Sequence, residues 1–87
     1  MSLLDTIYNY NEPFVRDELV KQSKGLNLDE GVLSDVLCVA LNHVPPKYIK
    51  HSVDCAFYTQ DAEREATRKA IETAVADALK YINSQSF

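Results

Sequence analysis

One apolar segment that stops at two consecutive prolines constrains the fold of this chain more than any other feature. Between residues 33 and 44, apolar side chains recur every three or four positions, which is the spacing of one face of an α-helix. Proline lacks a backbone N–H and restricts the residue before it, so this helix must end at Pro45-Pro46. Three more apolar residues widen the surface: Val32, Cys38 and Val39. The pattern predicts a central helix over about 30–44, covered on more than one side.

Two further blocks have helical periodicity. The first covers about 4–24, but Pro13 interrupts it, so the helix either starts near Asn11-Glu12 after a short lead-in or bends at the proline. The other covers 61–83, where every fourth residue from Ala62 to Ala78 is alanine. Such a ridge of small side chains lets another helix approach closely.

Residues 45–60 fit neither the helical nor the strand period, and we expect an ordered connector with a short helical turn or an extended piece. Ile49, Val53 and Phe57 are its expected apolar anchors. The whole chain, 1–87, is predicted to be one all-α domain with three main helices (about 4–24, 30–44 and 61–83) and the connector 45–60. Its marginal size and wide apolar surface favour a homodimer, either intertwined or packed through helices.

The composition excludes several classes of function. The formal net charge of −4 argues against binding to duplex nucleic acid, which needs a broad basic surface. No glycine follows Gly31, so a glycine-rich phosphate loop is absent, and neither a CxxC motif nor a His pair at i and i+4 indicates zinc. We expect no catalytic residues, no metal and no cofactor, and therefore no enzyme. Asp61 and Glu65 could pair in a hydrolase, but on a helix surface they are most simply solvated charges.

The sequence favours a cytoplasmic protein that does not enter the membrane. Its first residues lack the basic and apolar regions of a signal peptide, and no apolar stretch is long enough to span a bilayer. Cys38 lies in the apolar run and is expected to be a small buried hydrophobe with a reduced thiol.

The proline turn lies in a local excess of positive charge. Between residues 36 and 53 there is no acidic residue, whereas that stretch contains His43, Lys47, Lys50 and His51. Lysines supply charge to phosphates, and the rings of Tyr48 and Tyr58 offer stacking faces to a base. The rigid prolines reduce the entropy lost on binding. This pattern favours a compact anionic ligand.

A purely structural interpretation of the same residues stays open. A lysine near a helix C-terminus is favourable through the helix dipole alone. Asn42 can bond the unpaired carbonyl groups at that helix end, and Tyr48 can pack its ring into the core.

Residues 35–48 resemble the signature of the late competence development protein ComFB family. The matching residues are Asp35, Ala40-Leu41-Asn42 and Pro45-Pro46-Lys47-Tyr48. The stretch from His51 to Tyr58 also resembles one branch of the family. A weaker match comes from Asn9, Glu12 and Val15. Some members carry a cysteine cluster before the aspartate, but residues 27–34 of this chain contain no cysteine, so no zinc is expected.

The resemblance implies a small, mostly helical, dimeric and non-enzymatic signalling protein. Some members are described as receptors for cyclic dinucleotides, which here implies c-di-GMP or c-di-AMP as the ligand and an unidentified protein effector as the partner. The alternative is a ligand-free dimeric adaptor that uses the turn for protein interaction. The residues expected to bind the ligand, from the charge pattern and the resemblance together, are Asp35, Asn42, Pro46, Lys47, Tyr48, Lys50, His51 and Tyr58.

Overall fold

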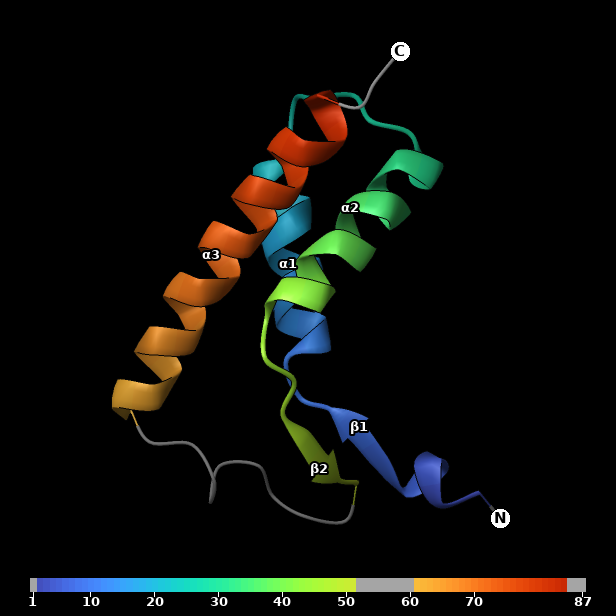
Figure 1. Cartoon of the computed structure of the whole chain (residues 1–87), viewed down its shortest axis with the longest axis vertical. Coiled ribbons are helices and arrows are strands. Elements are labelled where there is room, and N and C mark those ends of the chain that lie inside the picture. The colour runs from blue at the N-terminus through green and yellow to red at the C-terminus, as the bar shows by residue number, and fades with distance from the viewer. Residues whose placement is uncertain (1, 52–60, 85–87) are drawn as a thin grey trace.

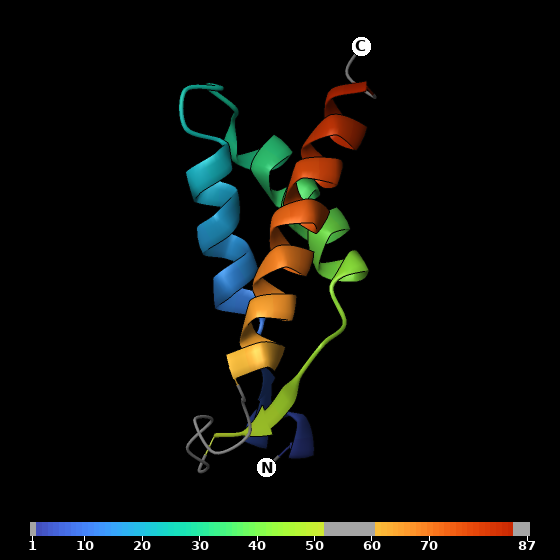
Figure 2. The same cartoon turned by 90° about the vertical axis from the view of Figure 1, so that its left-hand side faces the viewer.

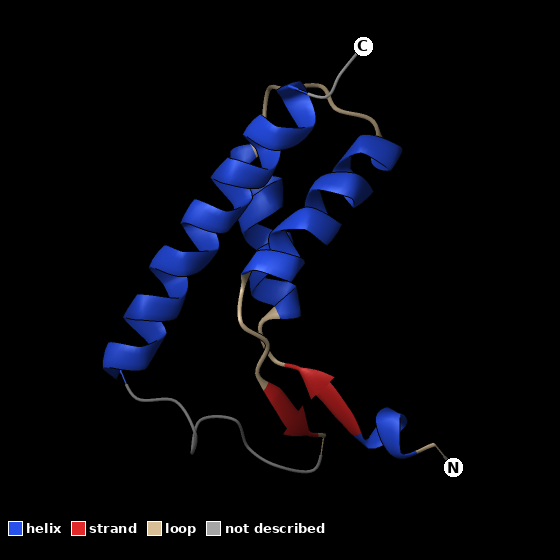
Figure 3. Ribbon diagram, in the orientation of Figure 1, coloured by secondary structure: helices blue, strands red, loops and turns tan. Residues whose placement is uncertain are grey.

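Helices dominate the computed structural model, which describes residues 2–51 and 61–84 (Figures 1 and 3). A short strand pair lies at one end of the helices. In chain order the elements are the 3-10 helix η1 (Leu3–Thr6), strand β1 (Ile7–Asn9), helix α1 (Glu12–Gln22), helix α2 (Glu30–His43), strand β2 (Tyr48–Lys50) and helix α3 (Asp61–Ser84). The prediction of a mostly helical chain is confirmed, but the prediction of an all-α fold is wrong because β1 and β2 form a sheet.

The central and C-terminal helices have the expected limits. Helix α2 begins after Asp29, whose side chain accepts a hydrogen bond from the Val32 backbone N–H at 2.8 Å. It ends at His43 because Val44 takes up an extended conformation, with φ −105° and ψ 121°, as a residue before proline prefers. The predicted helices 30–44 and 61–83 are therefore each confirmed within one residue.

The N-terminal helix is shorter than predicted. We expected 4–24, but α1 starts at Glu12, with Pro13 in its first turn. A helix continuing upstream would set the Pro13 ring against the carbonyl group of Asn9 and leave that carbonyl without a partner. Residues 7–9 instead pair with β2, so the first of the two alternatives at Pro13, a helix start near Asn11-Glu12, is correct.

The strand pair joins the segment before α1 to the segment after α2. It is antiparallel, and Asn9 lies opposite Tyr48, Tyr8 opposite Ile49 and Ile7 opposite Lys50. One further backbone bond flanks it at each end, from Tyr10 N–H to Lys47 O (2.6 Å) and from His51 N–H to Thr6 O (3.0 Å). Of the two alternatives for the connector, a short helical turn or an extended piece, the extended piece is confirmed at residues 48–50.

Of the three expected apolar anchors of the connector, Ile49 is buried. The other two, Val53 and Phe57, lie outside the described residues.

All three helices contribute to the core. Its most buried side chains are Val15 from α1, Val36 and Ala40 from α2, and Val75 and Ala78 from α3. Helix α1 lies against one side of the pair formed by α2 and α3, as the two orthogonal views show (Figures 1 and 2). The alanine ridge of α3 is divided: Ala74 and Ala78 are buried, whereas Ala66 and Ala70 are exposed.

Within one chain, α2 is covered on fewer sides than its apolar character predicts. Cys38, expected to be buried, is exposed, and several apolar neighbours are only partly buried: Val32, Leu33, Leu37, Val39 and Leu41. The radius of gyration is 14.4 Å, whereas a compact domain of this length has about 12 Å. The single chain therefore leaves apolar helix surface in contact with solvent. In the described ranges, no helix has both the length and the apolar character needed to cross a membrane.

The two glycines predict opposite effects of the same substitution. Gly25 has φ +83°, which costs an alanine roughly 1–2 kcal/mol, so Gly25→Ala should lower the free energy of unfolding by about 1 kcal/mol. Gly31 lies in the first turn of α2, and a Cβ there meets only Asp29 Oδ1 at 3.4 Å. Gly31→Ala should raise the free energy by about 0.5 kcal/mol. Urea denaturation of both variants measures this difference, and changes of equal sign would contradict it.

Candidate functional site

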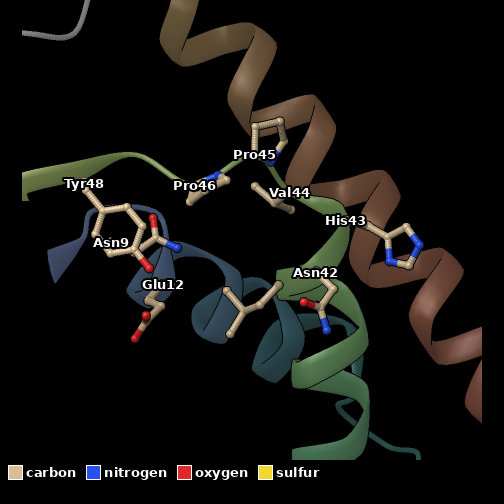
Figure 4. A pocket seen from close by; sticks show the side chains of 9 residues that line it. Asn9, Glu12, Asn42, His43, Val44, Pro45, Pro46 and Tyr48 are labelled. Atoms are coloured by element: carbon tan, nitrogen blue, oxygen red, sulfur yellow. The ribbon is translucent and has the colours of Figure 1, made fainter.

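A pocket of about 460 Å³ lies at the proline turn, where the end of α2 meets β1, β2 and the start of α1 (Figure 4). We call it the proline pocket. Four elements contribute to it, so residues far apart in the sequence meet there. Its lining residues are Asn9, Glu12, Leu41, Asn42, His43, Val44, Pro45, Pro46 and Tyr48.

Two buried asparagines connect the turn to the start of α1. The Asn9 Oδ1 atom accepts hydrogen bonds from the backbone N–H of Asn11 at 3.1 Å and from that of Lys47 at 2.9 Å. The Asn11 Nδ2 atom donates to the carbonyl oxygen of Pro45 at 2.9 Å. Asn11 precedes α1 but makes no side-chain capping bond to it. Its side-chain amide instead connects the start of α1 to the proline turn, 34 positions later in the sequence.

The double proline leaves acceptors at the end of α2. In a continuing helix, the N–H groups of residues 45 and 46 would donate to the carbonyl groups of Leu41 and Asn42. Pro45 and Pro46 have no N–H to donate. The two carbonyl groups therefore lack helical partners, and both belong to residues that line the proline pocket.

Three of the eight predicted ligand residues line this pocket: Asn42, Pro46 and Tyr48. Tyr48 is 63% exposed, so its ring does not pack into the core. Asn42 is exposed and makes no side-chain hydrogen bond to any described residue. It does not bond the unpaired carbonyl groups at the helix end. The neighbouring His43 side chain bonds one turn back, through Nδ1 at 2.8 Å from Val39 O. The structural interpretations of Tyr48 and Asn42 are therefore wrong.

Lys47 lies in an ion pair rather than in the pocket. Its Nζ atom is 3.1 Å from Glu63 Oε1 in the first turns of α3, and its side chain is only 24% exposed. Residues 36–53 contain no acidic residue, but in the fold Glu63 from α3 and Glu12 from α1 lie next to them. The proline turn is less cationic in space than in the sequence.

The other two cationic candidates lie on opposite faces of the strand pair. Alternate residues of a strand face opposite sides, so Tyr48 and Lys50 share one face, and both are exposed. His51, just past β2, stacks on Tyr8, with ring centroids 4.7 Å apart. Tyr8 lies opposite Ile49, on the face away from Tyr48. The side chains of Tyr48 and Lys50 therefore lie on one face of the strand pair, and the His51 ring lies on the other with Tyr8.

One predicted residue, Asp35, lies outside the lining of the pocket. Asp35 is exposed on α2 and lies two helical turns before Asn42, outside the lining residues. Tyr58 lies outside the described residues.

Two residues of the proline pocket, Asn9 and Glu12, were not among the predicted ligand residues. Both lie before or at the start of α1, more than thirty positions before the double proline. The available signal was the weak match of Asn9 and Glu12 to the family, together with two asparagines two and four positions before Pro13. Their contribution follows from the strand pair, which the sequence did not predict.

Of the acidic pair considered for hydrolysis, the structure describes the side chain of Glu65. The hydrogen bond and the charge of Arg68 lower the pKa of Glu65, as in a surface ion pair. The Asp61 side chain lies outside the described residues. In the two described segments, no three His, Cys, Asp or Glu side chains gather closely enough to hold a metal ion.

Comparison with known proteins gives one match. The model of a protein family described as Late competence development protein ComFB matches residues 8–86, which include every residue of the proline pocket. No curated protein and no solved structure matches the chain.

The two hydrogen bonds that Asn9 Oδ1 accepts can be tested for their contribution to stability. Asn9→Ala removes the partner of two backbone N–H groups and should lower the free energy of unfolding by about 2–3 kcal/mol. Asn42→Ala, at an exposed asparagine of the same pocket, should change it by less than about 0.5 kcal/mol. Thermal unfolding followed by circular dichroism measures both. Equal losses would show that the Asn9 bonds do not stabilise the turn.

Proposed function

The chain belongs to the late competence development protein ComFB family, and from this premise we propose that it is a non-enzymatic signalling domain. In this proposal it binds a cyclic dinucleotide, c-di-GMP or c-di-AMP, and passes that state to a protein effector. The observation that carries the proposal is the proline pocket, in which Asn42, Pro46 and the exposed ring of Tyr48 lie together. They belong to the stretch through which the sequence resembles the family.

The pocket suits a base better than a phosphate. Its volume of about 460 Å³ lies within the usual range for small-molecule sites, roughly 300–1,000 Å³. The Tyr48 ring offers a stacking face, and the Asn42 amide can both donate and accept. Among the lining residues, Glu12 and the carbonyl groups of Leu41 and Asn42 would repel an anion.

The phosphates of the ligand would therefore lie outside the pocket, beside Lys50. This lysine is exposed, shares the face of Tyr48 and has no ion pair with a described residue. Lys47 contributes less, because Glu63 already offsets its charge. Asp35 and His51 have no direct role in this arrangement. They lie outside the pocket and on the opposite strand face, respectively.

We also propose that two chains associate through α2 and α3. A groove of about 990 Å³ lies between these helices, with Ala70, Ala74 and Ala78 from α3 and Val39 from α2 among its lining residues. Small side chains allow a further helix to approach closely, and α2 carries more apolar surface than one chain covers. The same groove supports the alternative function, a ligand-free dimeric adaptor, in which the proline turn is a docking surface or plain structure.

Calorimetric titration tests the ligand. At low salt, wild-type protein should bind c-di-GMP, c-di-AMP or both. Tyr48→Ala should weaken binding about 10- to 100-fold, because stacking contributes roughly 1–3 kcal/mol per base, whereas Tyr48→Phe should retain most of the affinity. The absence of heat with both nucleotides would remove the receptor function and leave the adaptor.

A charge reversal tests the phosphate contact. Lys50→Glu should weaken binding about tenfold or more and reduce its dependence on salt, because a phosphate loses its cation. Lys24→Glu changes the net charge equally at an exposed lysine after α1 and should have little effect. Lys50 is a better choice than Lys47, because Lys47→Glu would also place two carboxylates together at Glu63. Equal effects at Lys50 and Lys24 would contradict a local contact.

Sedimentation equilibrium tests the association of two chains. Wild-type protein at micromolar concentration should have the mass of two chains. Ala70→Glu places a charge in the groove at an exposed position and should produce monomers, whereas Ala66→Glu, one turn earlier and outside the groove lining, should not. A monomeric wild-type protein would contradict the homodimer.

A further inference from the structure

We propose that the proline pocket selects guanine over adenine and that Glu12 is the residue that makes this selection. The inference rests on the proposed function, because it assumes that the base of a nucleotide enters the pocket. To the proposed function it adds which base the pocket binds, and it gives a role to Glu12, a residue far from the double proline in the sequence.

Several hydrogen-bond acceptors belong to the residues that line the pocket. The Glu12 carboxylate accepts only, and the carbonyl groups of Leu41 and Asn42 lack helical donors because residues 45 and 46 are prolines. The oxygen of Asn9 already accepts two backbone bonds. A base edge with several N–H groups can use these acceptors, and the amide N–H groups of Asn9 and Asn42 can donate to the acceptor atoms of the same base.

The backbone at Glu12 is fixed next to the turn, and its side chain is exposed to a ligand. It is the first residue of α1, directly after Asn11, whose backbone and side chain both take part in the bonds that connect α1 to the turn. Its carboxylate has no hydrogen bond or ion pair with any described residue. Figure 4 shows Glu12, Asn9 and Tyr48 at one end of the pocket and Asn42 across from them. A base stacked on Tyr48 would have a carboxylate at its edge.

The two purines present different edges to a carboxylate. Guanine offers two adjacent donors, N1–H and the N2 amino group, which match the two oxygens of a carboxylate in a bidentate pair. Adenine offers one donor, the N6 amino group, beside the N1 acceptor, whose lone pair would face a carboxylate oxygen. The Asn42 amide can donate to the remaining guanine acceptors, O6 or N7. Glu12 therefore attracts guanine and repels the matching edge of adenine.

The experiment compares affinities for c-di-GMP and c-di-AMP by calorimetry on the full chain. Wild-type protein should bind c-di-GMP at least about tenfold more tightly, which corresponds to about 1.4 kcal/mol. Glu12→Gln should reduce this ratio by about tenfold or more, since the amide presents one donor and one acceptor, as the adenine edge requires. Glu12→Gln also removes a negative charge, which would strengthen binding of both ligands alike because both carry the same phosphates. The ratio of the two affinities therefore reports base selection alone.

Glu30→Gln is the matched control. Glu30 is the first residue of α2, as Glu12 is of α1, and the substitution removes the same charge away from the pocket. The ratio of its affinities for c-di-GMP and c-di-AMP should equal the wild-type ratio. Equal binding of both nucleotides, or a Glu12→Gln ratio equal to the wild-type ratio, would overturn guanine selection but leave the receptor function in place. Binding of neither nucleotide would overturn both proposals.

Discussion

At the proline turn, hydrogen bonds from asparagine side chains take the place of helical backbone bonds. Pro45 and Pro46 cannot donate, so the chain after α2 cannot be held by continuing helical bonds. The side chains of Asn9 and Asn11 provide the replacement: Asn9 accepts from Lys47, and Asn11 donates to Pro45. Both asparagines are buried, at 8% and 6% exposure, where leaving such groups unpaired would be costly. These bonds place the end of α2 against the start of α1, and the pocket is the space between them.

The charge around the pocket shows why order in the sequence is a poor guide to charge in space. The stretch of residues 36–53 contains no acid, and on that basis it is a cationic bend suited to phosphate. Folding brings Glu63 to Lys47 and Glu12 to the pocket wall. The pocket then contains the carboxylate of Glu12, and an exposed lysine, Lys50, shares the strand face of Tyr48. A ligand with a neutral, donor-bearing part and an anionic part fits this division better than a simple anion does.

Periodicity predicted α2 and α3 well because each carries its own pattern of apolar residues and its own end signals. Asp29 and Pro45 define the ends of α2, and the alanines every fourth residue define α3. The strand pair was missed because three residues per strand carry too little alternation to be recognised, and its pairing depends on contacts between residues about forty positions apart. For the same reason the sequence identified Asn42, Pro46 and Tyr48, which are neighbours along the chain, but not Asn9 or Glu12. The residues of the site that come from one segment were predictable, and those that come from tertiary structure were not.

The last turn of α2 connects the pocket to the surface proposed for association. Asn42 and His43 line both the proline pocket and the α2–α3 groove, so the two hollows share a wall. A ligand can shift an equilibrium only through a difference in its contacts with the two states. Because asparagine bonds and prolines hold the turn, a ligand has little backbone freedom to order there. In the proposed receptor, the most direct effect of a ligand would be to change the surface and the hydrogen bonding of Asn42 next to the groove. Under that proposal, one turn of helix would connect the pocket to a second chain or an effector, without a large rearrangement of the fold.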